Sequence, residues 1–126
     1  MKTIIPLRNL TKTEIALGIG TISCLLCLAG CSESEAVKDR IRLSAIRNNV
    51  VLLQAAKDAW AFERLKQNGD VPTTNELAQF FKGEVLPATV AGEAYMLNPV
   101  GTPVVAKLSH KIGKWEAGQV LTVTNF

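Results

Sequence analysis

Hydrophobic positions in the middle of the chain recur with the spacing of an α-helix. Ile46, Val50, Leu53 and Trp60 are separated by three, four or seven residues, so on a helix they form one stripe. Further apolar residues widen this stripe over the second half of the segment: Leu52, Ala55, Ala56, Ala59 and Phe62. The pattern predicts a helix over residues 36–67 whose second half is packed on a domain.

Charged residues are concentrated in the first half of this predicted helix, at Lys38, Asp39, Arg40, Arg42 and Arg47. The first half is therefore expected to be more exposed to solvent than the second. The periodic pattern stops at Asn68-Gly69-Asp70. Gly69 has no Cβ and is suited to the left-handed residue that follows the end of a helix.

A second, shorter helix is predicted just after the first. Thr73 and, three residues later, Glu76 have the form of a capping box, in which each side chain accepts a hydrogen bond from the backbone of the other residue. The buried face of this helix is supplied by Leu77, Phe80 and Phe81. Gly83 is expected to end it.

Beyond the second helix the pattern changes to short, mainly apolar runs. Residues 95–97, 104–108 and 120–123 are typical of three strands. Segments 98–103 and 113–118 contain Pro or Gly and are expected to turn the chain between them. The order predicts an α+β domain, in which the long N-terminal helix packs on a small antiparallel sheet with one short second helix.

The N-terminal segment is organised differently from the rest. Basic residues come first (Lys2, Arg8 and Lys12), and an apolar run over residues 15–28 follows. Leu28-Ala29-Gly30-Cys31 then stands at the boundary to a polar stretch. This is the layout of a secretory signal, and the run is shorter than the ~20 residues that a membrane-spanning helix needs.

Leu28-Ala29-Gly30-Cys31 has the form of a lipobox, the cleavage and lipidation site of bacterial lipoprotein precursors. The thiol of Cys31 can take a diacylglyceryl group and the new N-terminal amine a further acyl chain such as palmitate, and two or three chains hold a protein stably at a membrane. We therefore expect a lipoprotein signal peptide over 1–30, a tether over 31–35 and a domain over 36–126. The other interpretation is an uncleaved membrane anchor with a chance cysteine, because the apolar run holds two further cysteines.

Charge and cysteine content narrow the functional classes. Residues 1–30 carry +2 of the formal net charge of +3, so the remaining chain is close to neutral and is not expected to bind nucleic acid. No cysteine follows Cys31, so the predicted domain can hold neither an internal disulfide nor a thiolate metal site. Its length suits one small domain.

The order of segments over residues 36–110 can be compared with that of known protein families. A long helix ends in the segment 56–63, residues 69–73 contain Gly-Asp and Pro-Thr, and residues 92–103 and 109–110 follow. This order resembles the globular head of type IV pilin-like and pseudopilin-like proteins. The resemblance implies that the second half of the long first helix packs on a small antiparallel sheet.

The chain departs from that family in two places. Family members often carry a cysteine pair in the head, where this chain has residues 86–88 and 104–106 without cysteine. Pilin precursors have Gly before the cut, an aromatic residue after it and Glu at the fifth mature position. Here Glu14 is fifth from Leu10, but Asn9 and Leu10 replace the Gly and the aromatic residue.

Few residues suggest a site of chemistry. His110 is the only histidine, and no second histidine or cysteine follows Cys31 to join it. No nucleophile motif, phosphate loop or metal spacing is present in the sequence, so no catalytic residue, metal site or cofactor is expected. The carboxylates spread along the predicted helix are more simply explained as part of a face exposed to solvent than as catalytic acids.

The two tryptophans are expected to have different roles. Trp60 lies on the helical stripe and is expected in the core, whereas Trp115 lies in a turn region and is the better candidate for a contact with a partner. The expected interaction surface combines Trp115 with Lys38, Arg42 and Arg47 in the first half of the long helix.

Three functions remain open at this point. The first is a non-enzymatic cell-envelope lipoprotein with its head in the periplasm, anchored by lipid and contacting an envelope protein. Ser32 follows the cysteine instead of the Asp that often retains lipoproteins at the inner membrane, so the outer membrane is favoured. The second is a type IV pilin or pseudopilin subunit that assembles into a filament through its uncleaved apolar N-terminal helix. The third is a small-ligand binding protein or hydrolase, which would need a concave polar pocket, although no small-molecule substrate is evident.

Overall fold

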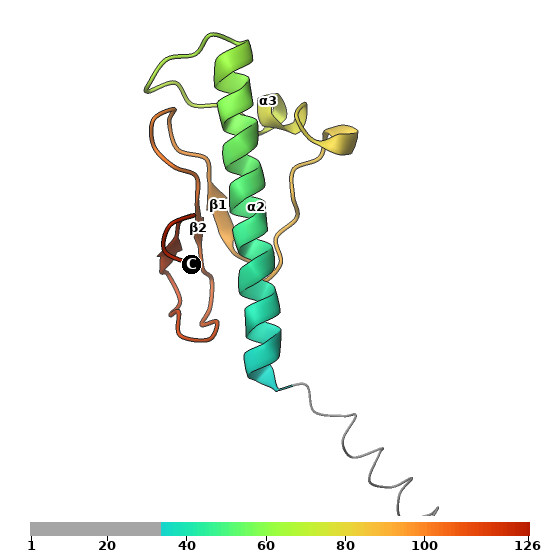
Figure 1. The fold of residues 1–126 in the computed structure, drawn as a ribbon, viewed down its shortest axis with the longest axis vertical. Coiled ribbons are helices and arrows are strands. Elements are labelled where there is room, and N and C mark those ends of the chain that lie inside the picture. Colours follow the sequence, from blue (N-terminus) through green and yellow to red (C-terminus); the bar gives the residue numbers. More distant parts are fainter. Residues whose placement is uncertain (1–33) are drawn as a thin grey trace, which may run out of the picture. The chain divides into compact units, whose positions relative to one another are not determined.

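The computed structural model describes residues 34–126. Residues 35–126 form one compact unit (Figure 1). The predicted signal peptide over residues 1–30, the lipidation site Cys31 and most of the tether lie outside the described residues, so these remain predictions.

The long helix α2 spans Glu35–Glu63 and buries one stripe along its length. Ile46 and Val50 are fully buried and Leu53 and Trp60 are each 2% exposed, so these four predicted core positions are confirmed. Leu52 and Phe62, which were expected to widen the same stripe, are 51% and 84% exposed on the opposite face of the helix, so that part of the prediction is wrong. Each such side chain contributes about 1.5–3 kcal/mol when it leaves water. Burial begins at Ile46, and the turns before it are exposed or half-buried, as the charges in the first half predicted.

The end of α2 differs from the prediction. The helix stops at Glu63 and does not continue to Gln67, because Leu65 takes a left-handed conformation with φ 50°. Lys66 N donates to Ala61 O at 2.8 Å and Leu65 N to Phe62 O at 3.3 Å, the two bonds that define a Schellman motif. Leu65, and not Gly69, therefore follows the helix end, and Gly69 (φ 100°) turns the loop beyond it.

The second helix, α3, spans Thr74–Ala78, and its capping box is confirmed. Glu76 N donates to Thr73 Oγ1 at 3.3 Å, and Thr73 N donates to Glu76 Oε2 at 2.8 Å. A short 3-10 helix, η1, follows at Lys82–Glu84. Gly83, predicted to end the second helix, lies inside η1 with φ 78°, so α3 is shorter than predicted.

Three short strands form one antiparallel sheet in the order β1-β2-β3. Ala106 pairs with Tyr95 on one side and with Leu121 on the other, so the middle strand is central. The strands are β1 (Ala94–Met96), β2 (Val105–Lys107) and β3 (Val120–Leu121). The predicted α+β architecture, one long helix with a short second helix and an antiparallel sheet, is confirmed in the described residues.

The strand limits differ from the prediction in detail. The first strand begins one residue earlier, and the second covers only the middle of residues 104–108. The third stops after Leu121, because Asn125 Oδ1 accepts the Thr122 backbone N–H at 2.6 Å. A longer strand would need that N–H for a neighbouring strand.

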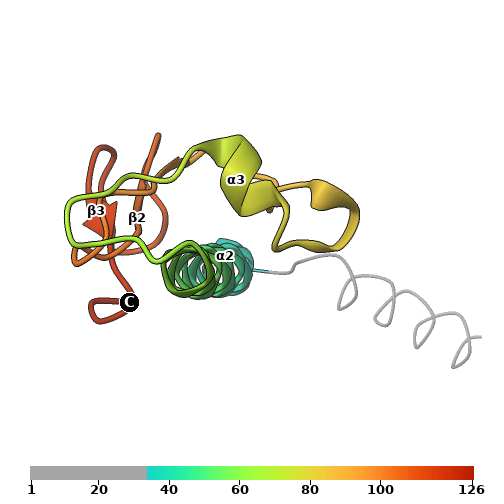
Figure 2. The same ribbon diagram turned by 90° about the horizontal axis from the view of Figure 1, so that it is seen from above.

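The core lies between α2 and the segments on one side of it (Figure 2). One cluster joins Ile46, Val50 and Leu53 of the helix to Val104, Ala106, Leu108, Ile112 and Leu121. A second cluster joins Ala56 and Trp60 to Leu77 of α3. The sheet therefore packs along the middle of α2 and the second helix along its C-terminal half.

Candidate interaction surface

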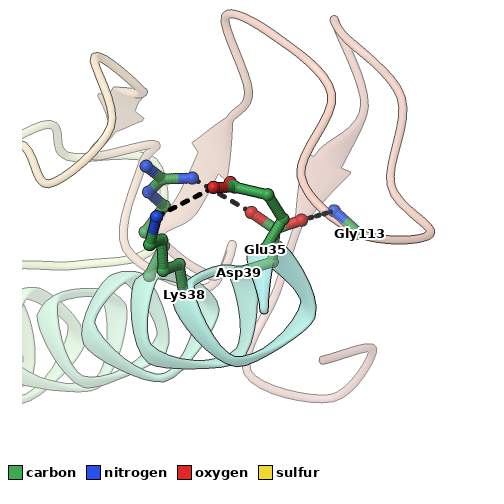
Figure 3. A network of polar contacts seen from close by, with 5 residues as sticks. Glu35, Lys38, Asp39 and Gly113 are labelled. Carbon is green, nitrogen blue, oxygen red and sulfur yellow. Dashed lines mark hydrogen bonds and ion pairs between the residues drawn. The ribbon is translucent and has the colours of Figure 1, made fainter. Parts of the chain in front are cut away.

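The first turns of α2 carry a chain of polar contacts (Figure 3). Lys38 Nζ donates to Glu35 Oε1 at 2.9 Å, and Arg42 Nη1 donates to Asp39 Oδ1 at 3.1 Å. The side chains of Lys38 and Arg42 are 43% and 40% exposed. Because they are four residues apart on a helix, these two predicted interaction residues lie on the same side of α2.

The turn that contains Trp115 is attached to this part of the helix. Ile112 and Trp115 exchange backbone hydrogen bonds of 2.9 and 3.0 Å around Gly113, which has φ 57°. Gly113 N donates to Asp39 Oδ2 at 2.9 Å (Figure 3). One carboxylate thus holds both Arg42 and the turn, so the structure brings Lys38, Arg42 and the Trp115 turn together.

Trp115 is only partly available to a partner. Its side chain is half-buried and packs against the cluster between the helix and the sheet. Lys114 Nζ lies 4.9 Å from the centre of its ring, within range of a cation–π contact. Replacement of this tryptophan would therefore disturb packing as well as any contact with another molecule.

Arg47 does not belong with the other two basic residues. It is exposed, but it lies five residues after Arg42, which places it about 140° further around the helix axis. Ile46 and Val50, on the buried face, lie between the two directions. The predicted surface is therefore split, with Lys38, Arg42 and Trp115 on one part and Arg47 on another.

His110 lies on the surface beside Ser109, whose Oγ is 3.0 Å from His110 Nδ1. Among the described residues, no group of three or more His, Cys, Asp or Glu side chains could hold a metal ion.

Lys57 is a buried charge that the sequence analysis did not identify. Its side chain is 1% exposed, and Nζ donates to the backbone carbonyls of Leu97 (3.0 Å), Asn98 (3.4 Å), Pro99 (3.3 Å) and Thr102. Burial lowers the pKa of Lys57, while the nearby Asp58 carboxylate acts in the opposite direction. Carbonyls can only accept, so the arrangement suits the protonated ammonium with its three N–H donors.

Glu93 is the second buried charge, 3% exposed, and immediately precedes β1. Its carboxylate accepts from Val90 N (3.0 Å), Ala91 N (2.8 Å) and the Tyr95 hydroxyl. Burial by itself would raise the pKa of Glu93, but these hydrogen bonds outweigh it and hold the pKa below 4.5. Burial and the bond to Glu93 raise the pKa of the Tyr95 hydroxyl.

Asn49 connects this carboxylate network to α2. Its Nδ2 donates to the Tyr95 hydroxyl oxygen at 2.9 Å and to Ala88 O at 3.0 Å. This network, and the backbone carbonyls that accept hydrogen bonds from Lys57, both connect the helix to the segment around β1. The polar groups of both sites form hydrogen bonds within the protein. This arrangement is typical of structural hydrogen-bond networks and not of an acid–base pair that faces a substrate.

One signal for Lys57 was present in the sequence. It falls four residues after Leu53 and three before Trp60, directly on the apolar stripe. Residue type opposed that position, because lysine is almost never fully buried without partners. No comparable pattern marked Glu93, since its donors come from an irregular loop.

A shallow apolar groove of about 310 Å³ lies along the C-terminal half of α2. Its walls are Leu52, Ala55, Ala56 and Ala59 on the helix, with Phe80, Phe81 and Lys82 from the segment after α3. The lining offers apolar contact and few polar groups, which suits a side chain of another protein better than a polar substrate.

Comparison with protein-family models, with curated proteins and with solved structures finds no match for this chain. Within residues 34–126, no helix has both the length and the hydrophobicity to cross a membrane.

Proposed function

We propose that this chain is a lipid-anchored lipoprotein of the bacterial cell envelope, whose α+β head makes protein contacts and carries out no catalysis. The observation that carries the proposal is Leu28-Ala29-Gly30-Cys31 behind a basic leader and a short apolar run. The start of α2 at Glu35 supports it, because the folded unit begins only four residues after the proposed anchor.

Lipidation is tested by metabolic labelling of the full chain with a palmitate analogue. The wild-type protein should be labelled and Cys31→Ala should not. Cys24→Ala and Cys27→Ala are matched controls within the same segment, and both should retain the label. Equal labelling of Cys31→Ala and wild type would contradict the proposal.

The membrane is tested through Ser32. The residue after the lipidated cysteine sets retention in many lipoproteins, and Ser32 favours the outer membrane with the head in the periplasm. Density-gradient fractions of cells should hold the wild-type protein with the outer membrane, and Ser32→Asp should move it to the inner membrane. An unchanged distribution would contradict the outer-membrane assignment.

The proposed contact surface for an envelope protein is formed by Lys38, Arg42 and the Trp115 turn, which share the anchor-proximal end of α2. Lys38→Glu removes the exposed ion pair with Glu35 but leaves the Asp39 contacts in place, so it should reduce cross-linking to an envelope protein and change the melting temperature only slightly. Lys107→Glu, an exposed charge on β2, serves as the control. Unchanged cross-linking by Lys38→Glu would exclude this surface.

A pilin or pseudopilin subunit is the second candidate, favoured by Glu14 at the fifth position from Leu10. In that case the apolar segment would remain attached to α2 and assemble into a filament. The mass of the mature N-terminus separates the two candidates, because lipoprotein processing begins the chain at a modified Cys31 and prepilin processing begins it near Leu10.

A further inference from the structure

The side of α2 that faces away from the sheet is apolar along the whole helix. In Figure 2, where the helix is seen nearly end-on, no described segment covers its lower side. Ile41 is 60% exposed, Leu52 51% and Phe62 84%. We call this face the outer stripe; its apolar members are Val37, Ile41, Val51, Leu52, Ala55, Ala59 and Phe62.

The outer stripe is uncharged, since only Ser44 and Asn48 lie between its apolar residues at helical spacing. The 310 Å³ groove opens onto its C-terminal half, where Ala55 and Ala59 keep the helix surface low between Leu52 and Phe80. A surface of this kind fits another apolar helix, whose larger side chains can enter the groove.

Charges on the two flanks of the outer stripe indicate what charge pattern a helix packed on this stripe would carry. Arg40 and Asp58 lie on one flank, eighteen residues or about five turns apart, and Lys38 and Glu63 lie on the other. On both flanks a basic residue is near the start of α2 and an acidic residue is near its end. Arg47 also lies on the flank of Arg40, near the middle of the helix, and Lys38 is paired with Glu35 within its own helix. Within residues 34–126, neither Arg40 nor Glu63 forms an ion pair.

We infer that a second copy of this chain packs its own α2 antiparallel on the outer stripe, forming a twofold-symmetric dimer. Antiparallel helices bring like flanks together, so Arg40 meets the partner's Asp58 and Lys38 meets the partner's Glu63. Each pair occurs twice by symmetry. A parallel arrangement would instead place the basic ends of the two helices side by side.

The size of the surface indicates a weak dimer. Twenty-nine residues give a helix about 43 Å long, and a contact strip about 10 Å wide is at the small end of specific interfaces. Dimers are therefore expected to form with a Kd of about 1–100 µM. The pairing uses only residues of α2 and does not depend on acylation of Cys31.

The test uses full-length protein in cells with a photo-cross-linking residue at position 48, which lies near the expected twofold axis. A cross-linked dimer should form from position 48 and not from position 107 on the outside of β2. Arg40→Glu and Asp58→Arg should each reduce the dimer about tenfold, because each change turns two attractive pairs into two repulsive ones. The double variant should recover the dimer to within about threefold of wild type.

Three results would overturn the inference. These are no dimer from position 48, a product of another mass that the charge changes leave unaltered, or a double variant no better than the single ones. Helical content of the single variants is checked by circular dichroism, and both positions are exposed, so folding should be retained. Palmitate labelling at Cys31 should be the same in all variants, so failure of the dimer and failure of the lipoprotein proposal are distinguishable.

Discussion

Lys57 and Glu93 show how a charged side chain can be enclosed without a charged partner. The lysine faces backbone carbonyls of the turn between β1 and β2, and the glutamate faces backbone N–H groups of the loop before β1. Backbone dipoles thus replace counter-ions in both places. The hydrogen bonds of each buried charge connect a helix or strand to an irregular segment that has few apolar residues to stabilise it.

Lys57→Met should destabilise the domain by about 2–4 kcal/mol, because methionine keeps most of the volume but leaves several carbonyls without a donor. Urea denaturation followed by tryptophan fluorescence measures the change. Lys107→Met on the exposed side of β2 is the control and should cost less than about 0.5 kcal/mol. Similar small effects for both variants would mean that the turn finds other donors.

Glu93 makes stability depend on acid pH. Its pKa in the folded state is held below 4.5, so its contribution is complete above the unfolded value and is lost as the pH falls through the folded value. In the wild type, the urea concentration at the unfolding midpoint should stay nearly constant from pH 7 downward and should decrease once the pH is below about 4.5. Glu93→Gln should be less stable at pH 7 and should show a smaller fall.

Glu76 also has a lowered pKa, because the backbone and hydroxyl of Thr73 bind its carboxylate. Glu76→Gln therefore serves as the comparison for the same acid range. If Glu93→Gln kept the full wild-type pH dependence and Glu76→Gln removed it, the capping box and not the buried carboxylate would be the source.

At the scale of elements, the end of α2 shows how a helix can stop at a residue with no stop signal of its own. Leu65 is 87% exposed, so no packing of its side chain accounts for its left-handed backbone. The Schellman bonds from Leu65 and Lys66 satisfy carbonyls at the helix end, and the following loop is held where Gly69 N donates to Val100 O at 3.1 Å.

Leu65→Gly should stabilise the domain by about 0.5–1 kcal/mol, since glycine removes the left-handed penalty and loses part of the gain through its flexibility when unfolded. Leu65→Ala keeps the Cβ and should change stability little. Gly69→Ala should have the opposite effect, a loss of about 1 kcal/mol, because φ is 100° there. Thermal unfolding of the three variants ranks them, and a loss for Leu65→Gly would contradict the argument.

At the scale of the whole molecule, residues 35–126 contain two packed clusters along one helix. Trp60 is the largest member of the cluster that holds α3, and its Nε1 has no hydrogen-bond acceptor among the described residues. Because the clusters share α2, the domain is expected to unfold as one unit.

Trp60→Ala should cost about 3–5 kcal/mol, the range for removal of a large buried aromatic side chain. Trp60→Phe should cost less, about 1–2 kcal/mol, because phenylalanine fills part of the space and brings no N–H that needs an acceptor. Denaturant unfolding of residues 35–126 measures both. Phe62→Ala, two residues away on the exposed side, should stay within about 0.5 kcal/mol, and a Trp60→Ala loss as small as that would show that Trp60 contributes little to the core.

The proposed sites were only partly predictable from the chain. Lys38 and Arg42 share a side because four-residue spacing brings helical neighbours together, and this could be read directly. That the Trp115 turn lies beside them depends on the bond from Gly113 to Asp39, seventy-four residues apart in the chain. Arg47 was grouped with them by charge, although its angular position separates it.

Short-range patterns determined much of this protein. The helical stripe, the capping box of Thr73 and Glu76, the turn between the first two strands and the α+β class all follow from residues a few positions apart, whose geometry is local. Tertiary structure alone decided the burial of Lys57, since its acceptors come from 40 to 45 residues further along. It also decided that one apolar face of α2 would be covered while the outer stripe stayed open, because periodicity marks apolar faces but only packing selects which of them meets the sheet.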